Sequence, residues 1–552
     1  MSYAELHCLS DFSFQRGASS ALELFERAKA CGYEALAITD ECSLAGIVRA
    51  FEASKRVELP LIVGTEIQLA DGPKLVLLAE GQRGYESICG LITTGRRAAA
   101  KGHYHLQRTD LTHGLPGTLA LWVPGPLDPE HAAWFKATFG DRGWLAVELH
   151  RDRNDAKRVT ALTELADRFG FRLVAAGDVH MATRGRRALQ DVLTATRFNL
   201  PVSQAGAHLF RNGERHLRKL DALEAIYLSQ WRAESVAIAR RCTFRLDQLR
   251  YRYPAEIVPE GYTPASWLRS LTEDGIRWRW PQGETPAVRQ QIEHELSLIR
   301  ELDYEPYFLT VHDIVRFARE QGILCQGRGS AANSAVCYVL GITAVDPGKH
   351  DMLFERFLST ARDEPPDIDV DFEHARREEI IQDIYARYGR ERAGIAATVI
   401  RYRPRSAIRE VGKVMGLTDD VTARLAGSQW GSFGSDIPDR HLEQAGLDVG
   451  NPTVIQAVVM TRRLLQFPRH LSQHVGGFVL TQDRLDELVP IGNAAMPDRT
   501  TIEWDKDDID ALRFMKVDVL ALGMLTCMRK GLDLIAEHKG IALDLATIPA
   551  ED

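Results

Sequence analysis

The segment Pro366 to Phe372, with the sequence PDIDVDF, constrains the fold more than any other part of the chain. Acidic and apolar residues alternate in it, and successive residues of a β-strand point to opposite faces of a sheet. As a strand, the segment places Asp367, Asp369 and Asp371 on one face and its apolar residues against a core. Because three like charges on one face repel each other, metal ions or basic side chains must neutralise them. We therefore expect a metal-binding face here rather than a solvated strand edge.

A similar acidic strand is expected far along the chain, at Phe514 to Leu520 (FMKVDVL). Lys516 and Asp518 share one face of this strand because they are two residues apart. A further carboxylate beside a lysine fits two Mg²⁺ ions that bridge a triphosphate. Taken alone, Asp518 is also compatible with an ordinary polar residue of a strand.

A glycine-rich turn, Gly327 to Ser334 (GRGSAANS), precedes a helical pattern from Ala335 to Leu340. Glycines let backbone N–H groups approach a phosphate closely, and a helix N-terminus attracts the anion, with Ser330 as the expected N-cap. The Gly-Lys-Ser/Thr ending of a Walker A loop is absent from the sequence of this turn. By itself the turn could equally be a simple helix cap, so it indicates phosphate binding only together with the acidic strands.

The first 240 residues alternate between helical and strand patterns. We expect amphipathic helices at Ala21 to Gly32 and Ala156 to Phe169. About seven short strands with helices between them are typical of an open α/β sheet or a distorted α/β barrel. The predicted strands include residues 34–40, 61–66, 75–79, 119–123, 144–150 and 172–180.

A chain of 552 residues exceeds the roughly 250 to 300 residues at which a single core stops growing, so we expect two or three packing units. We place a boundary at Tyr251 to Ala265, where prolines interrupt the periodicity. Long helices are expected beyond it, at Thr285 to Tyr304 with Thr285 as N-cap, and at Val311 to Gln321.

The composition excludes several classes of protein. With 45% hydrophobic and 26% charged residues, the chain is not disordered, collagen-like or a coiled coil. There is no run of about 18 apolar residues, no signal-peptide pattern and no CxxC pair among eight cysteines, so we expect a cytoplasmic protein with reduced thiols. The net charge of −8 argues against a surface that coats nucleic acid everywhere, but it allows a local basic groove.

Such a local basic segment occurs at residues 387–413, which hold eight Arg or Lys against two Glu. Cations that alternate around an aromatic residue, Tyr402, suit contacts to nucleic-acid phosphates without reading bases. A solvated arginine face is the alternative interpretation. The candidate DNA-binding residues are Arg401, Arg403, Arg405, Arg409 and Lys413, with His474 in a later glycine-containing turn.

Polar residues follow several predicted strands of the first region. In an α/β barrel the C-terminal ends of the strands converge, so these residues are expected to meet in one site. Imidazole and carboxylate suit Zn, Mn or Mg, and such ions could activate a water molecule against a phosphate ester. Each residue alone is also explained as an ordinary polar strand end. The candidates are His7, Asp40, Glu66, Glu148, His150, Asp178 and His180.

Four segments, which contain five of these residues, resemble the polymerase-and-histidinol-phosphatase (PHP) domain that heads bacterial C-family DNA polymerases. They are residues 3–17, 38–41, 64–66 and 177–180. PHP motifs usually read His-x-His and Asp-His, whereas Leu9 and Glu41 replace the second histidines here. The resemblance therefore implies a degenerate site that binds Zn or Mn weakly or not at all, and a mainly structural domain.

Further segments resemble the palm and thumb of the bacterial DNA polymerase III alpha subunit family, and three sequence stretches resemble its error-prone, damage-inducible branch. They are residues 327–343, 354–358, 366–381, 470–480 and 504–526, with RPRSAIREVGK, PRHLSQHVGG and NAAMPDRT pointing to the branch. The resemblance covers nearly the whole chain. It implies an α/β multidomain protein: a PHP-type distorted α/β barrel followed by a nucleotidyltransferase-like palm with an inserted helical thumb.

The same resemblance implies a domain order. Residues 1–240 would form the PHP-like domain, 241–400 the first part of the palm, 401–475 the thumb and 476–552 the second part of the palm. Fingers and C-terminal domains should follow, so we expect this chain to be an N-terminal portion of a longer polymerase or an engineered truncation.

By the same resemblance, three aspartates hold two catalytic Mg²⁺ ions: Asp369, Asp371 and Asp518, with Asp367 as a non-catalytic neighbour. Residues of the glycine-rich turn and one lysine would contact the nucleotide: Gly327, Arg328, Gly329, Ser330 and Lys516.

The implied activity is error-prone DNA-directed DNA synthesis for DNA damage tolerance, in which dNTPs are added to a primer 3′-OH. The implied partners are primer–template DNA, a sliding clamp, an inactive Y-family-like polymerase and a recombinase-like protein. Two alternatives stay open: a PHP-type phosphoesterase or exonuclease, against which Leu9 and Glu41 argue, and a non-catalytic fragment that binds DNA or partners.

Overall fold

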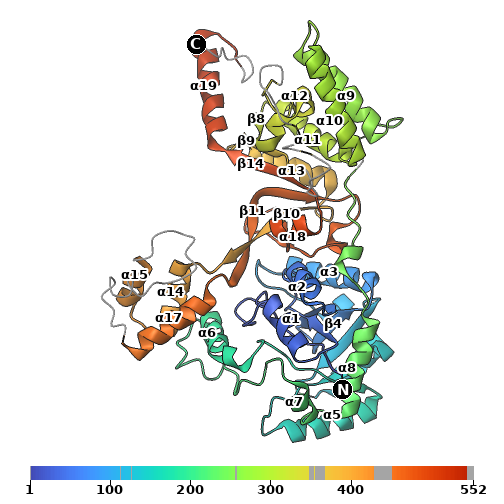
Figure 1. Cartoon of the computed structure of the whole chain (residues 1–552), viewed down its shortest axis with the longest axis vertical. Coiled ribbons are helices and arrows are strands. Elements are labelled where there is room, and N and C mark those ends of the chain that lie inside the picture. Colours follow the sequence, from blue (N-terminus) through green and yellow to red (C-terminus); the bar gives the residue numbers. More distant parts are fainter. Residues whose placement is uncertain are drawn as a thin grey trace. The chain divides into compact units, whose positions relative to one another are not determined.

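The computed structural model describes residues 2–111, 114–125, 127–254, 258–346, 354, 358, 367–427 and 450–543. The chain forms two compact units, whose elements are labelled in Figure 1. Unit 1 consists of Met1–Leu249, Thr398–Ser472 and Glu487–Asn493, and unit 2 of Arg250–Ala397, Gln473–Asp486 and Ala494–Asp552. Each unit is therefore built from segments that lie far apart in the sequence. Among the described helices, none combines the length and the apolar character that crossing a bilayer requires.

Unit 1 contains a seven-stranded sheet in the order β1-β2-β3-β4-β5-β6-β7, which matches the predicted number of strands. The central strands β3, β4 and β5 are antiparallel neighbours, and the other neighbours are parallel. A bridge between Cys8 and Val179 joins the chain just beyond β1 to the chain beyond β7, so the sheet curls toward a barrel. The strands are β1 Ala4–Glu5, β2 Ala35–Ile38, β3 Leu61–Gln68, β4 Lys74–Ala79, β5 Thr118–Val123, β6 Gly143–Val147 and β7 Arg172–Ala175.

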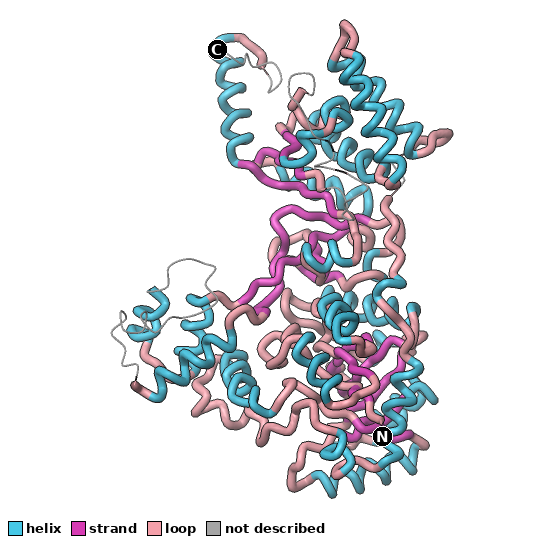
Figure 2. The backbone as a smooth tube through the Cα atoms, viewed as in Figure 1, coloured by secondary structure: helices cyan, strands magenta, loops and turns pink. Residues whose placement is uncertain are grey.

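Helices alternate with these strands, as the sequence pattern predicts (Figure 2). The first helix begins at a capping box, in which Ser20 and Glu23 each accept a hydrogen bond from the other's backbone N–H. The helices are α1 Ala21–Ala30, α2 Ile47–Val57, α3 Gln82–Arg97, α4 Pro129–Phe139, α5 Asp155–Phe169, α6 Arg187–Phe198, α7 Leu220–Glu224 and α8 Ser229–Arg241.

Three further helices of unit 1 come from the segment predicted as the thumb: α14 Pro404–Val414, α15 Asp419–Gly427 and α17 Pro452–Leu464. Helices α14 and α17 pack on each other and on α6. Their shared apolar cluster includes Leu193 of α6, Val411 of α14 and Leu464 of α17. Residues 398–472 and the first 249 residues thus share one core.

Unit 2 contains a second sheet, whose strands follow the order β13-β10-β11-β14-β9-β8. They are β8 Cys325–Arg328, β9 Asp369–Glu373, β10 Ala393–Arg401, β11 Pro468–Leu480, β13 Thr500–Ile502 and β14 Lys516–Leu522; β12, Ile491–Asn493, belongs to unit 1. The helices of unit 2 are α9 Pro264–Arg279, α10 Pro286–Glu301, α11 Glu305–Glu320, α12 Ala335–Val339, α13 Arg377–Tyr388, α18 Lys506–Ala511 and α19 Gly523–Lys539.

The predicted start of one helix is confirmed and that of another is wrong. Thr285 caps α10, and its hydroxyl oxygen accepts a 3.3 Å hydrogen bond from the backbone N–H of Val288. The helix predicted from Val311 begins six residues earlier, at Glu305. Pro306 occupies the first turn of this helix, where a missing N–H removes no intrahelical hydrogen bond.

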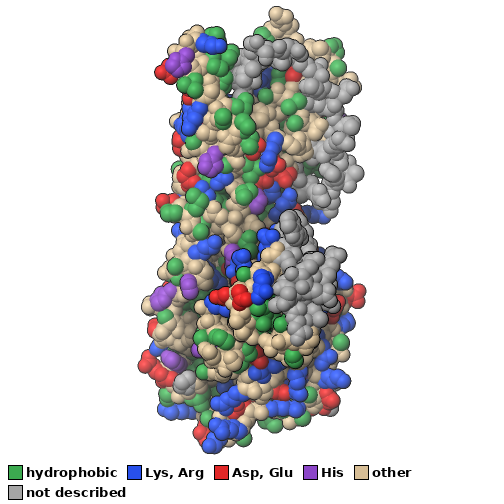
Figure 3. All heavy atoms as spheres, turned by 90° about the vertical axis from the view of Figure 1, so that its left-hand side faces the viewer, with side chains coloured by type: hydrophobic (Ala, Val, Ile, Leu, Met, Phe, Trp, Pro, Cys, Tyr) green, Lys and Arg blue, Asp and Glu red, His purple; other side chains and the backbone are tan. Residues whose placement is uncertain are grey.

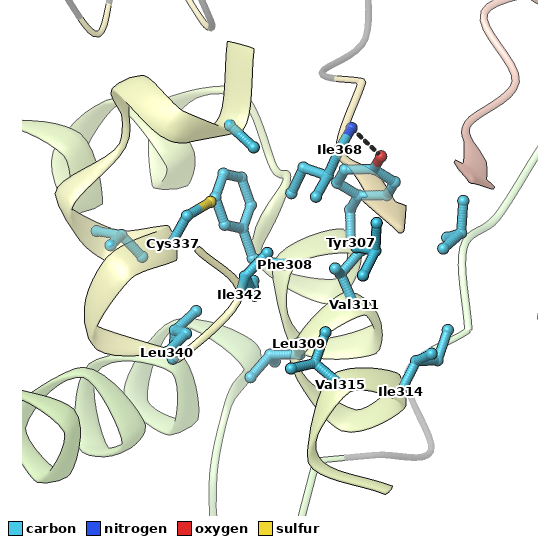
Figure 4. Packing of buried hydrophobic residues seen from close by; sticks show 14 of the residues in the cluster. Tyr307, Phe308, Leu309, Val311, Ile314, Val315, Cys337, Leu340, Ile342 and Ile368 are labelled. Atoms are coloured by element: carbon cyan, nitrogen blue, oxygen red, sulfur yellow. Dashed lines mark hydrogen bonds between the residues drawn. The ribbon is translucent and has the colours of Figure 1, made fainter. Parts of the chain in front are cut away.

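The core of unit 2 packs α10, α11 and α12 against the inner face of β9 and β14. Figure 4 shows part of it: Phe308, Val311 and Ile342 contribute apolar side chains around Ile368, the residue that precedes β9. Ile368 and Val370 are buried, as the alternating pattern predicts, which leaves the aspartates between them for the other face.

Candidate functional site

Asp369 and Asp518 lie side by side at the starts of two parallel strands. The register of β9 and β14 pairs Asp369 with Asp518, Val370 with Val519 and Asp371 with Leu520. One oxygen each of Asp367, Asp369 and Asp518 lies within 4.8 Å of the others, which is close enough for all three to contact one metal ion. The acidic pattern at 366–372 and the separate Asp518 therefore form one cluster.

Lys516 neutralises part of this cluster. Its Nζ lies 2.8 Å from Oδ1 of Asp367 and 2.5 Å from Oδ2 of Asp518, and Nζ of Lys506 lies 3.6 Å from Oδ2 of Asp367. Burial opposes the charged form of Lys516, but attraction by Asp518 and Asp367 outweighs it and raises the pKa. Lys516 therefore stays protonated as a fixed cation within the site.

The crowding of negative charge affects the pKa of Asp369. Burial, a hydrogen bond with Asp518 and repulsion by Asp367 and Asp518 raise the pKa of Asp369 to about 6. A carboxylate in this position is stabilised by a bound cation, because the cation favours the charged form that its neighbours disfavour.

Asp518 supplies the observation that best fits a metal. Its Oδ1 is buried and has no hydrogen-bond partner among the described residues. Nδ1 of His474 lies 3.9 Å from this oxygen, but it accepts hydrogen bonds from the N–H groups of Gly476 and Gly477 and so donates none to Asp518. A buried carboxylate oxygen without a donor is the kind of ligand that Mg²⁺ prefers.

Gly477 is needed for this arrangement. It faces Asp518 across the antiparallel pair β11 and β14. A Cβ atom at position 477 would lie 2.9 Å from Oδ1 of Asp518 and 2.8 Å from Nδ1 of His474. Any larger residue would therefore push the two side chains apart.

Asp371 lies two residues further along the same face of β9, outside the group of three. Its Oδ2 lies 3.3 Å from Nε of Arg328, and the same Nε lies 4.0 Å from Oδ2 of Asp369. Burial raises the pKa of Asp371, and Arg328 partly offsets the effect. The guanidinium of Arg328 is about half exposed and so is available to an incoming anion.

The glycine-rich turn lies against the same cluster. Gly329 has a φ of +66°, and its Cβ position lies 3.7 Å from Oδ2 of Asp369. Ser330 donates a 3.2 Å hydrogen bond to the carbonyl oxygen of Asp367. Gly327 is also constrained, since a Cβ there would lie 2.6 Å from the carbonyl oxygen of Ile342. The turn thus holds exposed backbone close to the carboxylates.

The prediction that Ser330 caps the following helix is wrong. Residues Gly329–Asn333 form a 3₁₀ turn, and Ser334 caps α12 by accepting a 3.0 Å hydrogen bond from Cys337 N. A buried carboxylate, Glu295 of α10, accepts further hydrogen bonds from the N–H groups of Ala335 and Val336 and from the Ser334 hydroxyl. The N-terminus of α12 is therefore already occupied by the protein's own anion.

Tyr307 is a site residue that sequence reasoning missed. Its hydroxyl accepts a 2.9 Å hydrogen bond from the N–H of Ile368 and donates a 3.1 Å bond to the carbonyl oxygen of Lys516 (Figure 4 shows the first). The buried ring of one α11 residue thereby joins the starts of β9 and β14, between which the acidic cluster lies. No local pattern indicates bonds across 61 and 209 residues.

Unit 1 contains a second cluster that could hold an ion, formed by His7, Glu66 and Asp178. Nδ1 of His7 lies 2.7 Å from Oε1 of Glu148, and Nε2 lies 2.7 Å from Oε2 of Glu66. A carboxylate only accepts, so both ring nitrogens donate and His7 is an imidazolium. Attraction to Glu148 and Glu66 outweighs burial and raises the pKa of His7. An imidazolium has no lone pair for a metal.

Basic side chains occupy the rest of this cluster. Nη1 of Arg16 lies 2.5 Å from Oε2 of Glu41 and 2.7 Å from Oε1 of Glu66, and Nζ of Lys74 lies 2.6 Å from Oε2 of Glu66. Arg215 forms an ion pair with Asp178. With His7 protonated, four cations therefore face the four carboxylates of Glu41, Glu66, Glu148 and Asp178.

The remaining residues of the predicted PHP site lie at the margin of this cluster. Asp40 accepts hydrogen bonds from Ser10 and Ser13. Nε2 of His150 contacts the carbonyl oxygen of Gly177, and burial together with Arg215 lowers the pKa of His150 to about 4. Nε2 of His180 lies 3.0 Å from Oδ1 of Asp178, and burial and Arg16 lower the pKa of His180 to about 3.

The predicted DNA-binding residues are divided between the units. Arg403, Arg405, Arg409 and Lys413 are exposed on or beside α14 of unit 1, whereas His474 lies beside Asp518 in unit 2. Nη1 of Arg401 donates to the carbonyl oxygen of Gln466. The interpretation of Tyr402 as an aromatic surface between cations is wrong: it is fully buried, and its hydroxyl bonds to Glu410 at 2.6 Å. Lys and Arg side chains, interspersed with acidic ones, are visible in the lower half of Figure 3.

Two family models match the chain. Residues 266–521 match the bacterial DNA polymerase III alpha NTPase domain, and residues 5–166 match the PHP domain. Both are families of metal-dependent proteins, and the acidic cluster of unit 2 has the geometry to hold an ion. The chain therefore belongs to the bacterial DNA polymerase III alpha family, and its α/β fold class is confirmed.

The curated relatives that match the whole chain include error-prone DNA polymerases. The error-prone DNA polymerases of Pseudomonas fluorescens and Pseudomonas aeruginosa are each 58% identical over 552 residues, which is all of this chain and 54% and 53% of theirs. That of Xanthomonas oryzae pv. oryzae is 58% identical over 557 residues, 51% of its length. The chain spans about half the length of the curated relatives that it matches.

Among solved structures, an amidohydrolase from Chromobacterium violaceum is similar over 32% of this chain and 88% of its own, at 18% identity. Its TM-score of 0.24 is too low to support any inference.

Proposed function

We propose that this chain is part of an error-prone DNA polymerase in which unit 2 adds dNTPs to a primer 3′-OH. The observation that carries the proposal is the pairing of Asp369 and Asp518 on adjacent parallel strands, with an oxygen of Asp518 that has no protein donor among the described residues. Nucleotidyl transfer needs convergent carboxylates beside a source of positive charge for the phosphates.

Asp369, Asp371 and Asp518 would hold two Mg²⁺ ions, and oxygen ligands of this kind suit that metal. When bound, such ions would lower the pKa of the primer hydroxyl and neutralise charge on the leaving pyrophosphate. Lys516 fixes the positions of Asp367 and Asp518 through its two ion pairs. Asp367 would remain a partner of the lysine rather than a catalytic residue.

The protein itself would bind the triphosphate through Arg328 and the turn that follows it. The exposed guanidinium of Arg328 supplies charge, and the left-handed conformation of Gly329 turns backbone toward the carboxylates. We include Gly327, Ser330 and Lys516 in the nucleotide site, because Ser330 and Lys516 bond to Asp367 and Gly327 permits the close approach of the turn.

Primer–template DNA would contact the exposed cations of the segment 401–413 in unit 1 and His474 in unit 2. We also propose the domain assignment that the resemblance implies, namely PHP-like 1–240, palm 241–400 and 476–552, and thumb 401–475. A sliding clamp, an inactive Y-family-like polymerase and a recombinase-like protein stay predictions as partners.

For unit 1 we propose a structural domain rather than a phosphoesterase. Both ring nitrogens of His7 bond to carboxylates. Positive charge that metal ions would otherwise supply comes from Arg16, Lys74 and Arg215. A Zn or Mn ion would have to displace several ion pairs to bind, so its affinity should be low.

Primer extension tests the polymerase proposal. In full-length protein, Asp369→Asn and Asp371→Asn should each reduce dNTP addition to below roughly a hundredth of wild type, a loss of about 2.7 kcal/mol in transition-state stabilisation. Asp483→Asn, which changes an exposed carboxylate outside the cluster, is the matched control and should retain full activity. Folding is checked by thermal melting. Extension above that level by either cluster variant, with the control unaffected, would disprove the assignment.

A further inference from the structure

Unit 1 contains a pocket of about 730 Å³, and of its charged residues the proposed function explains only Arg401. Its lining includes the start of α1, the turn before α6, the end of β10 and the end of α17. A pocket of this volume accommodates a small molecule or a short stretch of a strand, but not a nucleic-acid duplex. Three arginines line it: Arg186, Arg401 and Arg463.

The three guanidinium groups have few carboxylates to balance them. Arg186 forms an ion pair with Glu23, whereas Arg463 and Arg401 donate to carbonyl oxygens, of Gly185 at 3.5 Å and of Gln466 at 2.9 Å. Burial and repulsion by Arg463 lower the pKa of Arg186, which shows that positive charge is crowded here. An anion would relieve this repulsion.

One further carboxylate, Asp11, lines the pocket and is 7% exposed. Burial and repulsion by Asp40, only partly offset by Arg401 and Arg49, raise the pKa of Asp11 to about 7. Near neutral pH this group therefore carries only part of a negative charge, and the pocket retains a net positive charge.

The pocket continues into the arginine segment at the start of α14. A second pocket, of about 610 Å³, is lined by Arg403, Arg405 and Arg469, and it shares Arg401 and Gln466 with the first. No carboxylate is among the residues that line this second pocket. Basic side chains thus follow each other from α14 through Arg401 to Arg463 and Arg186.

We infer that the first pocket binds a phosphodiester group of a single DNA strand that continues from the arginine segment 401–405. The inference rests on the proposed function, since that function brings DNA to this segment. Successive arginines suit a polyanion with regularly spaced phosphates better than an isolated small anion. The contact would hold the strand without reading its bases.

A pair of neighbouring arginines on α17 provides the test. Arg463 lines the pocket, whereas Arg462, also exposed, does not, so Arg463→Ala and Arg462→Ala remove the same charge from the same helix. Fluorescence anisotropy would measure binding of a labelled single-stranded oligonucleotide to the whole 552-residue chain at several salt concentrations. Thermal melting of each variant checks the fold.

We expect Arg463→Ala to weaken binding and to reduce the slope of log K against log salt by about 0.7, the value for one lost phosphate contact on a single strand. Arg462→Ala should leave the slope unchanged. Asp11→Asn removes the competing carboxylate and should tighten binding, while Arg403→Ala with Arg405→Ala should weaken it in a control measurement.

Equal effects of Arg463→Ala and Arg462→Ala, with the Arg403/Arg405 variant still weakened, would overturn the inference and leave the proposed function intact. No loss in any arginine variant would overturn both. The last measurement adds a dNTP as a competitor. If the dNTP displaces the oligonucleotide from wild type but not from Arg463→Ala, the pocket binds free nucleotides and the inference is wrong.

Discussion

Removing the hydroxyl of Tyr307 tests whether the two acidic strands depend on a buried hydrogen bond. Tyr307→Phe keeps the ring in the core but breaks the bonds to Ile368 N and Lys516 O. We expect a loss of about 1 kcal/mol in the free energy of unfolding. We also expect about a tenfold fall in kcat for dNTP addition with little change in KM, because the carboxylates lose their alignment.

Tyr85→Phe is the matched control for this residue. Tyr85 is equally buried and donates a 2.7 Å bond to the carbonyl oxygen of Leu488, within unit 1. It should lose similar stability and keep its kcat. A kcat that falls equally in both variants, or in neither, would show that Tyr307 has no positioning role.

Residues of the site could be predicted where the pattern that indicates them lies within a short stretch of sequence. Alternation of Asp with apolar residues placed Asp369 and Asp371 on one face, and both strands were expected. The contacts of Tyr307, and the ion pairs of Arg16, Lys74 and Arg215 around the second cluster, depend on residues distant in sequence, so no spacing rule indicates them. For Tyr402 the prediction was wrong because it relied on the basic neighbours in sequence, whereas the surroundings of the side chain in the fold decide its burial.

At the scale of elements, the carboxylate of Glu295 fixes α12 to α10. Burial, partly offset by hydrogen bonds from Val336, Ala335 and Ser334, raises the pKa of Glu295 to about 7. A group whose pKa is higher in the folded state binds protons more tightly there, so its contribution to stability is lost as the pH rises through that pKa. Wild type should therefore lose melting temperature between about pH 5 and pH 8.

Glu295→Gln removes this titration while keeping the shape of the side chain. Its melting temperature should depend less on pH than that of wild type, with the difference between the two changing as the pH rises to about 7 and staying constant above it. Melting curves at four pH values check this expectation. A difference between the two proteins that is constant across pH would contradict it.

The charged cluster of unit 1 joins several elements, and its basic side chains form ion pairs with its carboxylates. Arg16→Met would remove the ion pairs of Arg16 with Glu41 and Glu66, and breaking a buried pair typically costs about 3–5 kcal/mol. The exposed pair Arg245–Asp247 provides the control, since Arg245→Ala should cost less than about 1 kcal/mol. Urea unfolding measures both. Treatment with a chelator should leave the stability of wild type unchanged, and a large loss would instead indicate a bound ion.

Element boundaries show why part of the fold could not be predicted. Six of the seven strands of unit 1 could be predicted because short apolar runs alternate with amphipathic helices. The predicted strands at 144–150 and 172–180 end earlier, at Val147 and Ala175, since their polar ends leave the sheet to form the charged cluster. Ser334 caps α12 instead of Ser330, because Gly329 turns the chain into a 3₁₀ segment first.

At the scale of the whole molecule, the two units are not consecutive domains, because each is built from segments that are distant in sequence. Residues 398–472 return to the core of residues 1–249, where α14 and α17 pack on α6. Such a return cannot be deduced from composition or periodicity, because it depends on which apolar faces meet. A fragment of residues 1–240 alone would expose the apolar face of α6, so experiments on unit 1 should retain residues 398–472.

The final prediction concerns catalysis by the 552-residue chain. We expect it to extend a primer at less than about a tenth of the rate of a full-length relative such as the Pseudomonas aeruginosa error-prone DNA polymerase, which is nearly twice as long. The side chains of Asp367 and Asp369 are 40% and 31% exposed, and charges in contact with water interact weakly with phosphates and metal ions. On α19, Met524 and Leu534 are also exposed, so this helix presents an apolar face that no described residue covers. A site open to solvent does not enforce the geometry of attack on the nucleotide.

Steady-state extension with Mg²⁺ and all four dNTPs, on intact and lesion-bearing templates, measures the ratio of the two extension rates. Turnover within about tenfold of the relative would show that residues 1–552 already contain every group that the reaction needs.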